Sequence, residues 1–122
     1  MNIIEFFDQN WQLQKWQQGF SKRERTLLTG LSGTVKSLVM ANAYENVADK
    51  YIIVTDSQFH ANELYDELST LLGEEKVFQF FSDDNIYAEF ALASKDRIAY
   101  RLEALNFLLD ERATGFLVVP FL

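Results

Sequence analysis

Hydrophobic residues in this chain gather into short unbroken runs and into stripes spaced by three and four residues. Apolar runs of four or five residues, bounded by polar ones, indicate buried strands of a parallel sheet. Four such runs occur, at residues 26–29, 51–55, 77–81 and 116–119. Because helical stripes lie between them, we expect right-handed β-α-β crossovers, and hence an α/β fold in which flanking helices cover both faces of a parallel sheet.

The first helical stripe lies at the N-terminal end. Ile3, Phe7 and Trp11 are four residues apart, which predicts one amphipathic helix that ends near Gln18. We expect Trp11 and Trp16 to be packing residues, with a partner-binding edge as the alternative.

Two more helices follow the second and third runs. Asp56 or Ser57 is suited to cap the first of them, and Gly73 is suited to a left-handed end. The second of these helices is expected to begin at Ser94, after a polar turn at residues 82–85 and a short helix around 87–91. The buried stripes are expected at Ala61, Leu64, Leu68 and Leu71 in the first helix and at Ile98, Leu102, Leu105 and Leu109 in the second.

Composition and charge limit the domain count, the partners and the compartment that are expected for this chain. The chain has 122 residues, 48% of them hydrophobic, which predicts a single domain over residues 1–122 around one core. Its 18 acidic and 11 basic residues give a formal net charge of -7, which argues against unassisted nucleic-acid binding. Cysteine is absent, so a reducing, cytoplasmic setting is expected. No apolar stretch approaches the ~20 residues of a membrane-spanning helix.

Residues 30–37 carry the pattern with the most chemical content. A phosphate loop of the form G-x-x-x-x-G-K-[ST] points successive backbone N–H groups at phosphates from the start of a helix, whose partial positive charge favours anions. Gly30, Lys36 and Ser37 fall on the first glycine, the lysine and the magnesium-binding hydroxyl of that pattern. A strand is expected before them and a helix after them, as in nucleotide hydrolases.

The second glycine of this pattern is missing. Val35 stands in its place, and its branched side chain intrudes where the backbone must curl closely around a phosphate. If the position requires positive φ, strain adds about 1 to 3 kcal/mol. A plain strand-to-helix connection is the leading interpretation, and a residual anion site is the alternative. We therefore expect no cofactor on this degenerate loop, whose residues are Gly30, Ser32, Gly33, Thr34, Val35, Lys36 and Ser37.

No catalytic or metal-binding residue is expected beside this loop. Asp56 follows a strand, as the magnesium-binding acid of a hydrolase does, but it is better explained as a helix cap. The run at 116–119 ends in Pro120, without a carboxylate. His60, the only histidine, is expected to face solvent. A solvated turn is the interpretation for three acidic residues that lack the spacing of a calcium loop, Asp83, Asp84 and Glu89.

Three stretches carry a family resemblance. They are residues 27–37 (LLTGLSGTVKS), residues 52–57 (IIVTDS), and residues 97–106 (RIAYRLEALN) running on to residues 118–120 (VVP). Together they resemble the N-terminal, UvrB-like module of the bacterial transcription-repair coupling factors (Mfd), over nearly the whole chain. The Gly-Leu-Ser-Gly loop is more typical of the coupling factors than of the excision-repair helicase UvrB.

The resemblance implies a fold, a role and partners. The fold would be that of a P-loop NTPase or helicase domain, similar to domain 1a of UvrB, present as an N-terminal fragment of a longer protein. The module would have lost nucleotide binding, while an ATP-dependent DNA translocase motor lies elsewhere in the same polypeptide. It would support the adjacent UvrA-recruiting domain in transcription-coupled nucleotide excision repair. UvrA and RNA polymerase would bind other domains, and neither nucleic acid nor membrane would bind directly.

Two other functions stay open. The chain would be half of an ATP-dependent, UvrB-like DNA helicase with residual nucleotide binding if the other half supplied the missing acid and arginines. Alternatively, the net charge and the many aromatic residues suit an acidic module that binds a basic protein by itself.

Overall fold

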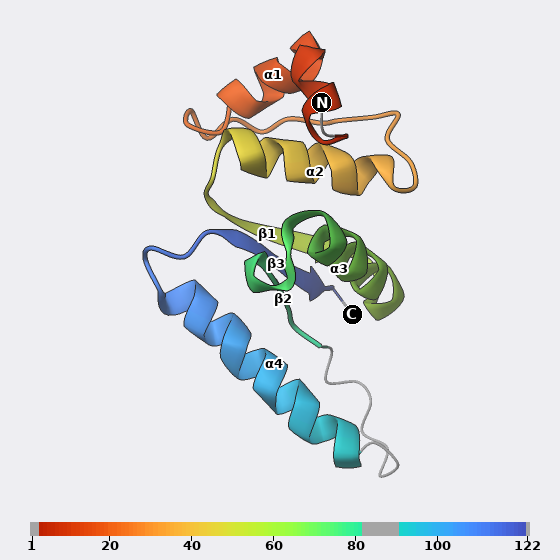
Figure 1. The fold of residues 1–122 in the computed structure, drawn as a ribbon, viewed down its shortest axis with the longest axis vertical. Coiled ribbons are helices and arrows are strands. Elements are labelled where there is room, and N and C mark those ends of the chain that lie inside the picture. Colours follow the sequence, from red (N-terminus) through yellow and green to blue (C-terminus); the bar gives the residue numbers. More distant parts are fainter. Residues whose placement is uncertain (1–2, 82–90, 122) are drawn as a thin grey trace. The chain divides into compact units, whose positions relative to one another are not determined.

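The computed structural model describes residues 3–81 and 91–121, with side chains from residue 98 onward in the second range (Figure 1). The chain forms two compact units, Met1–Ala48 and Asp49–Leu122, and each is described by itself. The first unit is helical, and the second contains a sheet with helices. The α/β class predicted from the sequence is confirmed in the second unit.

The first unit contains the 3-10 helix η1 (Glu5–Gln9) and the helices α1 (Trp11–Gln18) and α2 (Val35–Asn46). The single helix expected up to Gln18 is wrong, because the chain becomes extended at Asn10. The Asn10 side chain accepts hydrogen bonds from the backbone N–H groups of Gln12 and Leu13, at 3.0 and 3.2 Å. A side chain that caps a new helix in this way ends the preceding one.

The strand expected at residues 26–29 is also wrong. Residues 24–29 are irregular, and Leu27 is 84% exposed. A strand requires a neighbouring strand to receive its backbone hydrogen bonds, and the described part of this unit contains none. The loop at 30–37 therefore follows irregular chain, whereas a phosphate loop follows a strand.

The second unit is built on a three-stranded parallel sheet with the order β1-β3-β2. Its strands are β1 (Lys50–Thr55), β2 (Val77–Gln79) and β3 (Gly115–Pro120). The other three predicted strands are thus confirmed, and β2 is shorter than the predicted run at 77–81. Ile52 of β1 and Phe78 of β2 both lie beside Leu117 of β3. The central strand β3 is the most buried element of this unit.

Two long helices connect these strands, α3 (Gln58–Leu72) and α4 (Ala91–Leu109), with the 3-10 helix η2 (Glu74–Lys76) after α3. The first connection crosses the sheet from β1 to β2, at the far edge, and the second returns from β2 to β3 in the centre. Because the two connections cross the sheet in opposite senses, right-handed crossovers place α3 and α4 on opposite faces. Ala61 and Leu68 of the predicted α3 stripe are fully buried. Ser57 caps the helix and Gly73, with φ 97°, ends it, as predicted.

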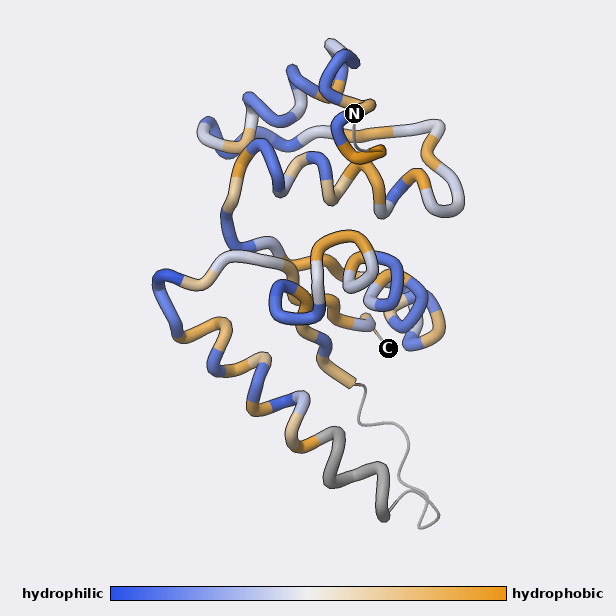
Figure 2. The backbone as a smooth tube through the Cα atoms, viewed as in Figure 1, coloured by the Kyte–Doolittle hydropathy of each residue, from blue (hydrophilic) through white to orange (hydrophobic). Residues whose placement is uncertain are grey.

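The stripe predicted to be buried on α4 is exposed instead, which is the largest correction to the predicted core. Figure 2 shows that hydrophobic positions recur along this helix. From residue 98 onward, the buried residues of this helix are Ala104 and Phe107, and the Phe107 ring stacks on Phe78 of β2 with centroids 4.6 Å apart. This stacking sets the rotation of the helix and leaves the predicted stripe 42–79% exposed, at Ile98, Leu102, Leu105 and Leu109.

Strand β1 lies at one edge of the sheet and is only partly covered. Ile52 and Val54 are exposed, although the sequence predicted strands buried on both faces. Successive side chains of a strand point to opposite faces, so both residues lie on one face of β1. Helix α4 packs mainly on β2. The turn expected at 82–85 and the start of the short helix expected at 87–91 lie outside the described residues.

Candidate functional site

The degenerate phosphate loop lies between irregular chain and α2. Gly30 and Gly33 have φ angles of 82° and 59°, in the left-handed region that favours glycine. A methyl group added to either residue would meet no atom within 4 Å. The two glycines therefore serve the path of the backbone rather than close packing against another part of the molecule.

Two backbone N–H groups of this loop, those of Val35 and Lys36, donate to the loop itself. The Val35 nitrogen lies 3.3 Å from the Ser32 carbonyl oxygen, and the Lys36 nitrogen lies 3.4 Å from that of Gly33. Farther along the turn, the Leu38 nitrogen lies 3.1 Å from the Thr34 carbonyl oxygen. These bonds continue the hydrogen bonding of α2 backward into the loop.

Val35 is the first residue of α2 and carries no unusual backbone angle. Arg23 is the only non-glycine residue with positive φ in the described ranges. The strain considered for a valine at positive φ therefore does not arise, because the helix already begins at this residue. What the branched side chain changes is the space around the loop.

The structure does not bring Lys36 and Ser37 to one surface. Lys36 is exposed, whereas Ser37 is fully buried at 0% exposure. A phosphate loop needs both side chains on the ligand side, since the lysine binds a phosphate and the hydroxyl binds its magnesium ion. Ser32 and Thr34 are exposed beside them, and Thr34 makes no capping hydrogen bond with its side chain.

Asp56, the acid considered at the end of a strand, pairs with His60. Their Oδ1 and Nδ1 atoms are 2.5 Å apart, and both side chains are exposed, as expected for His60. The hydrogen bond from His60 lowers the pKa of the Asp56 carboxyl. Asp56 is thus not the helix cap, because the Ser57 hydroxyl accepts the His60 backbone N–H at 3.2 Å. The four-residue spacing of Asp and His was the sequence signal for this pair.

A cluster of polar side chains in the first unit was missed by the sequence analysis. Asn42 and Gln17 are buried, and the Gln17 Nε2 donates to the Asn42 Oδ1 at 2.8 Å. The Asp8 Oδ1 accepts from the Asn42 and Asn46 side chains, at 2.7 and 2.9 Å. These bonds, first from Asn46 and then from Asn42, lower the pKa of Asp8. The one available signal was the spacing of Asn42 and Asn46, four residues apart on one helix.

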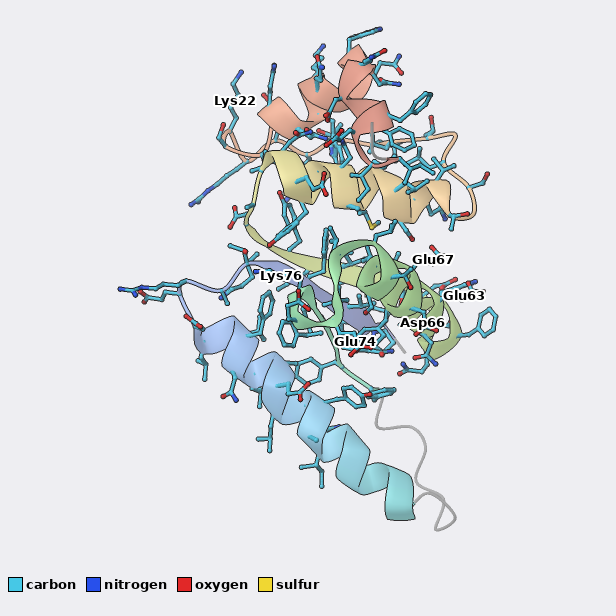
Figure 3. The ribbon with its side chains drawn as sticks, in the orientation of Figure 1. Lys22, Glu63, Asp66, Glu67, Glu74 and Lys76 are labelled. Atoms are coloured by element: carbon cyan, nitrogen blue, oxygen red, sulfur yellow. The ribbon has the colours of Figure 1, made fainter. Side chains whose placement is uncertain are left out.

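Acidic residues mark the surface of the second unit. Figure 3 shows Glu63, Asp66 and Glu67 on α3, with Glu74 in η2. Within the described ranges, no group of three or more His, Cys, Asp or Glu residues is arranged to hold a metal ion. Asp83, Asp84 and Glu89 lie outside those ranges. No helix that the structure describes is long and apolar enough to span a lipid bilayer.

Comparison with known proteins gives matches of one kind. The transcription-repair-coupling factor of Bacillus subtilis (strain 168) is 34% identical over 88 residues, which is 71% of this chain and 7% of that protein. The transcription-repair-coupling factors of Staphylococcus aureus strains USA300 and NCTC 8325 are each 25% identical over 95 residues, which is 78% of this chain and 8% of each protein.

No family model and no solved structure matches the chain. The chain spans less than a tenth of the length of the curated relatives that it matches. The resemblance stated from the loop and from the two later stretches is confirmed by these relatives. Over most of its length, this chain is related to a segment of the bacterial transcription-repair-coupling factors.

Proposed function

We propose that the chain is a non-catalytic structural and interaction module of a transcription-repair coupling factor. In this role it supports the adjacent UvrA-recruiting domain in transcription-coupled nucleotide excision repair. The observation that carries the proposal is that the Val35 and Lys36 backbone N–H groups donate to carbonyl oxygens of their own loop. A backbone donor used in this way is not available to a phosphate.

The side chains of the loop support the same role. Lys36 and Ser37 do not converge on one surface, since one is exposed and the other is buried. Val35 fills space that bare backbone leaves open in a working phosphate loop. The chain accordingly binds no cofactor, and the ATP-dependent DNA translocation of the coupling factors belongs to residues outside it.

Exposed apolar residues support an interaction role. Leu102 and Leu105 lie on one exposed stripe of α4, and large exposed apolar patches mark protein contacts. The proposed partners are the adjacent domains of the same polypeptide, with UvrA and RNA polymerase bound through other domains, in the cytoplasm. The acidic surface of α3 and the net charge of -7 oppose direct binding to nucleic acid.

Calorimetric titration with ATP and Mg²⁺ tests the loss of nucleotide binding. We expect no saturable heat at nucleotide concentrations up to about 1 mM, the range that corresponds to about 4 kcal/mol of binding free energy. Titration of Val35→Gly asks whether the valine alone blocks the site. A gain of phosphate affinity in that variant supports the steric role of Val35.

The alternative, half of a UvrB-like helicase with residual nucleotide binding, is favoured by the exposed Lys36 at the start of α2. It predicts saturable micromolar binding by the native chain, little change in Val35→Gly, and loss in Lys36→Ala. Lys22→Ala is the matched control, because Lys22 is an exposed lysine of the same unit outside the loop. Micromolar binding that Lys36→Ala abolishes and Lys22→Ala retains contradicts our proposal.

A further inference from the structure

The missed polar cluster of the first unit borders an open cavity of about 380 Å³. Amide side chains provide most of its lining, together with one carboxylate and one apolar residue. The lining residues are Asp8, Gln14, Gln17, Gln18, Asn46 and Val47. All of them belong to η1, α1 and the C-terminal end of α2, so the cavity lies within one unit.

Three of the four amide side chains that line this cavity already donate within the protein. Gln17 Nε2 donates to Asn42, and Asn46 Nδ2 donates to the Asp8 Oδ1 at 2.9 Å and to the Gln17 Oε1 at 3.2 Å. Gln14 Nε2 donates to the Asp8 backbone oxygen. Because Gln17 and Asn42 are buried, this arrangement is fixed in place without a ligand. Each of these three amide groups thus has at least one N–H engaged within the protein.

Other side-chain oxygens of the same groups accept no hydrogen bond from the described residues. Among the described residues, nothing donates to the Asp8 Oδ2, the Gln14 Oε1 or the Asn46 Oδ1. Asp8 also forms no ion pair with any described residue. An aspartate carboxyl is ionised at neutral pH, and the hydrogen bonds from Asn46 and Asn42 lower its pKa further. The cavity thus offers several acceptors and one negative charge.

We propose that this cavity binds an organic cation that carries several N–H donors, namely a guanidinium or a primary alkylammonium group. A guanidinium presents five donors in a planar fork, which suits a carboxylate flanked by neutral oxygen acceptors. Inorganic cations suit the cavity less well. Ca²⁺ takes six to eight oxygen ligands, and this lining supplies only one carboxylate. The binding site is independent of the phosphate loop, so it does not depend on the function proposed above.

Titration of the whole chain with agmatine tests the site, because agmatine carries a guanidinium and an ammonium group on a short alkyl chain. We follow the side-chain amide signals of Gln14 and Asn46 by ¹H–¹⁵N NMR. A single carboxylate in an open cavity predicts saturable shifts with a dissociation constant on the order of 1 mM, weakened by added salt.

Asp8→Asn removes the charge while keeping an oxygen that accepts from Asn42 and Asn46, and circular dichroism checks that the variant is folded. We expect binding to weaken at least about tenfold, since a charge-assisted hydrogen bond becomes a neutral one. Glu5→Gln is the matched control, because it removes one negative charge from the same 3-10 helix but does not line the cavity. Gln14→Met removes one neutral acceptor and is expected to weaken binding about threefold.

A capped Gly-Arg-Gly peptide separates the two sources of such a cation. Binding of both the peptide and agmatine indicates that the cavity accepts an arginine side chain of a protein, and binding of agmatine alone indicates a free small cation. Either result supports the site. The proposal is overturned if neither probe gives saturable shifts, if Ca²⁺ alone binds, or if Glu5→Gln weakens binding as much as Asp8→Asn.

Discussion

A single glycine allows the central strand of the sheet to begin. Gly115 has a φ of 146°, and a methyl group added to it would lie 2.2 Å from the Lys76 carbonyl oxygen. The Gly115 nitrogen also donates to the Asp49 carbonyl oxygen at 3.0 Å, so the position is fixed from two sides. Any side chain here requires the backbone before β2 or β3 to move.

We expect Gly115→Ala to lower the free energy of unfolding by about 2 kcal/mol or more, because backbone strain and a backbone clash act together. Urea denaturation measures the loss. Gly30→Ala is the control, since Gly30 also has positive φ but open space around it. A loss of about 1 kcal/mol is expected there. Equal losses in the two variants would show that the clash with Lys76 does not matter.

The Asp56–His60 pair predicts a pH dependence. The hydrogen bond with His60 lowers the Asp56 pKa below its ordinary value of 3.8 in the folded chain. A lowered carboxyl pKa stabilises the folded state fully above that value and loses its effect as the pH falls through the folded pKa. The stability difference between the native chain and Asp56→Asn should therefore be constant near neutral pH and shrink below about pH 3.8.

Thermal melts between pH 2 and 7 measure this difference. Asp66→Asn is the control, because Asp66 is an exposed carboxylate on α3, the helix that carries His60. A stability difference for Asp56→Asn that stays constant down to pH 2 contradicts the pairing.

Residue-scale features of the candidate site were only partly predictable. The replacement of a required glycine by Val35 is visible in the pattern of residues 30–37. The hydrogen bonds of the loop are not, because they depend on where α2 begins. Nor could the acceptors of the cavity be predicted, since Asp8, Gln14 and Asn46 come from three different elements and meet only in the folded unit.

At the scale of elements, α4 shows that an apolar stripe does not by itself fix which face of a helix is buried. The stripe at Ile98, Leu102, Leu105 and Leu109 has helical spacing and is nevertheless exposed. Two contacts hold the helix in another rotation. Phe107 stacks on Phe78, and the Lys50 Nζ donates to the carbonyl oxygens of Leu108 and Asp110 at 3.2 and 2.8 Å.

This rotation predicts unequal effects of two substitutions on one helix. Phe107→Ala should lower the free energy of unfolding by about 3 kcal/mol or more, because it leaves a cavity beside Leu117. Leu109→Ala should change it by less than about 0.5 kcal/mol, because that side chain is exposed. Chemical denaturation compares the two variants. A larger loss of unfolding free energy for Leu109→Ala than for Phe107→Ala would indicate that the stripe predicted from the sequence is the buried face.

Two of the four predicted strands have nearly the predicted bounds. The runs at 51–55 and 116–119 became β1 and β3 with nearly the predicted bounds. The run at 26–29 failed because strand formation depends on a neighbouring strand, which local sequence does not encode. β2 stops at Gln79, two residues before its predicted end, although the Phe80 nitrogen still donates to the Val118 carbonyl oxygen of β3.

For the molecule as a whole, the sequence predicted the α/β class and the parallel direction of the strands. It did not predict the strand order, because alternating strands and helices are compatible with several orders. The relation to the coupling factors supports the resemblance found in three stretches, over 71–78% of the chain. The expectation of a single domain over residues 1–122 stays a prediction.

The position of β3 has a consequence for how the protein is made. β1 and β2 are not neighbours in the sheet, and each pairs only with β3, the last of the three to be synthesised. At about 5–20 residues per second, the ribosome needs roughly 2–8 s to add residues 80–120 after β2. During that interval, the exposed edges of both early strands are open to chaperones or to pairing with other nascent chains. The second unit therefore gains its sheet only when its final strand has left the ribosome.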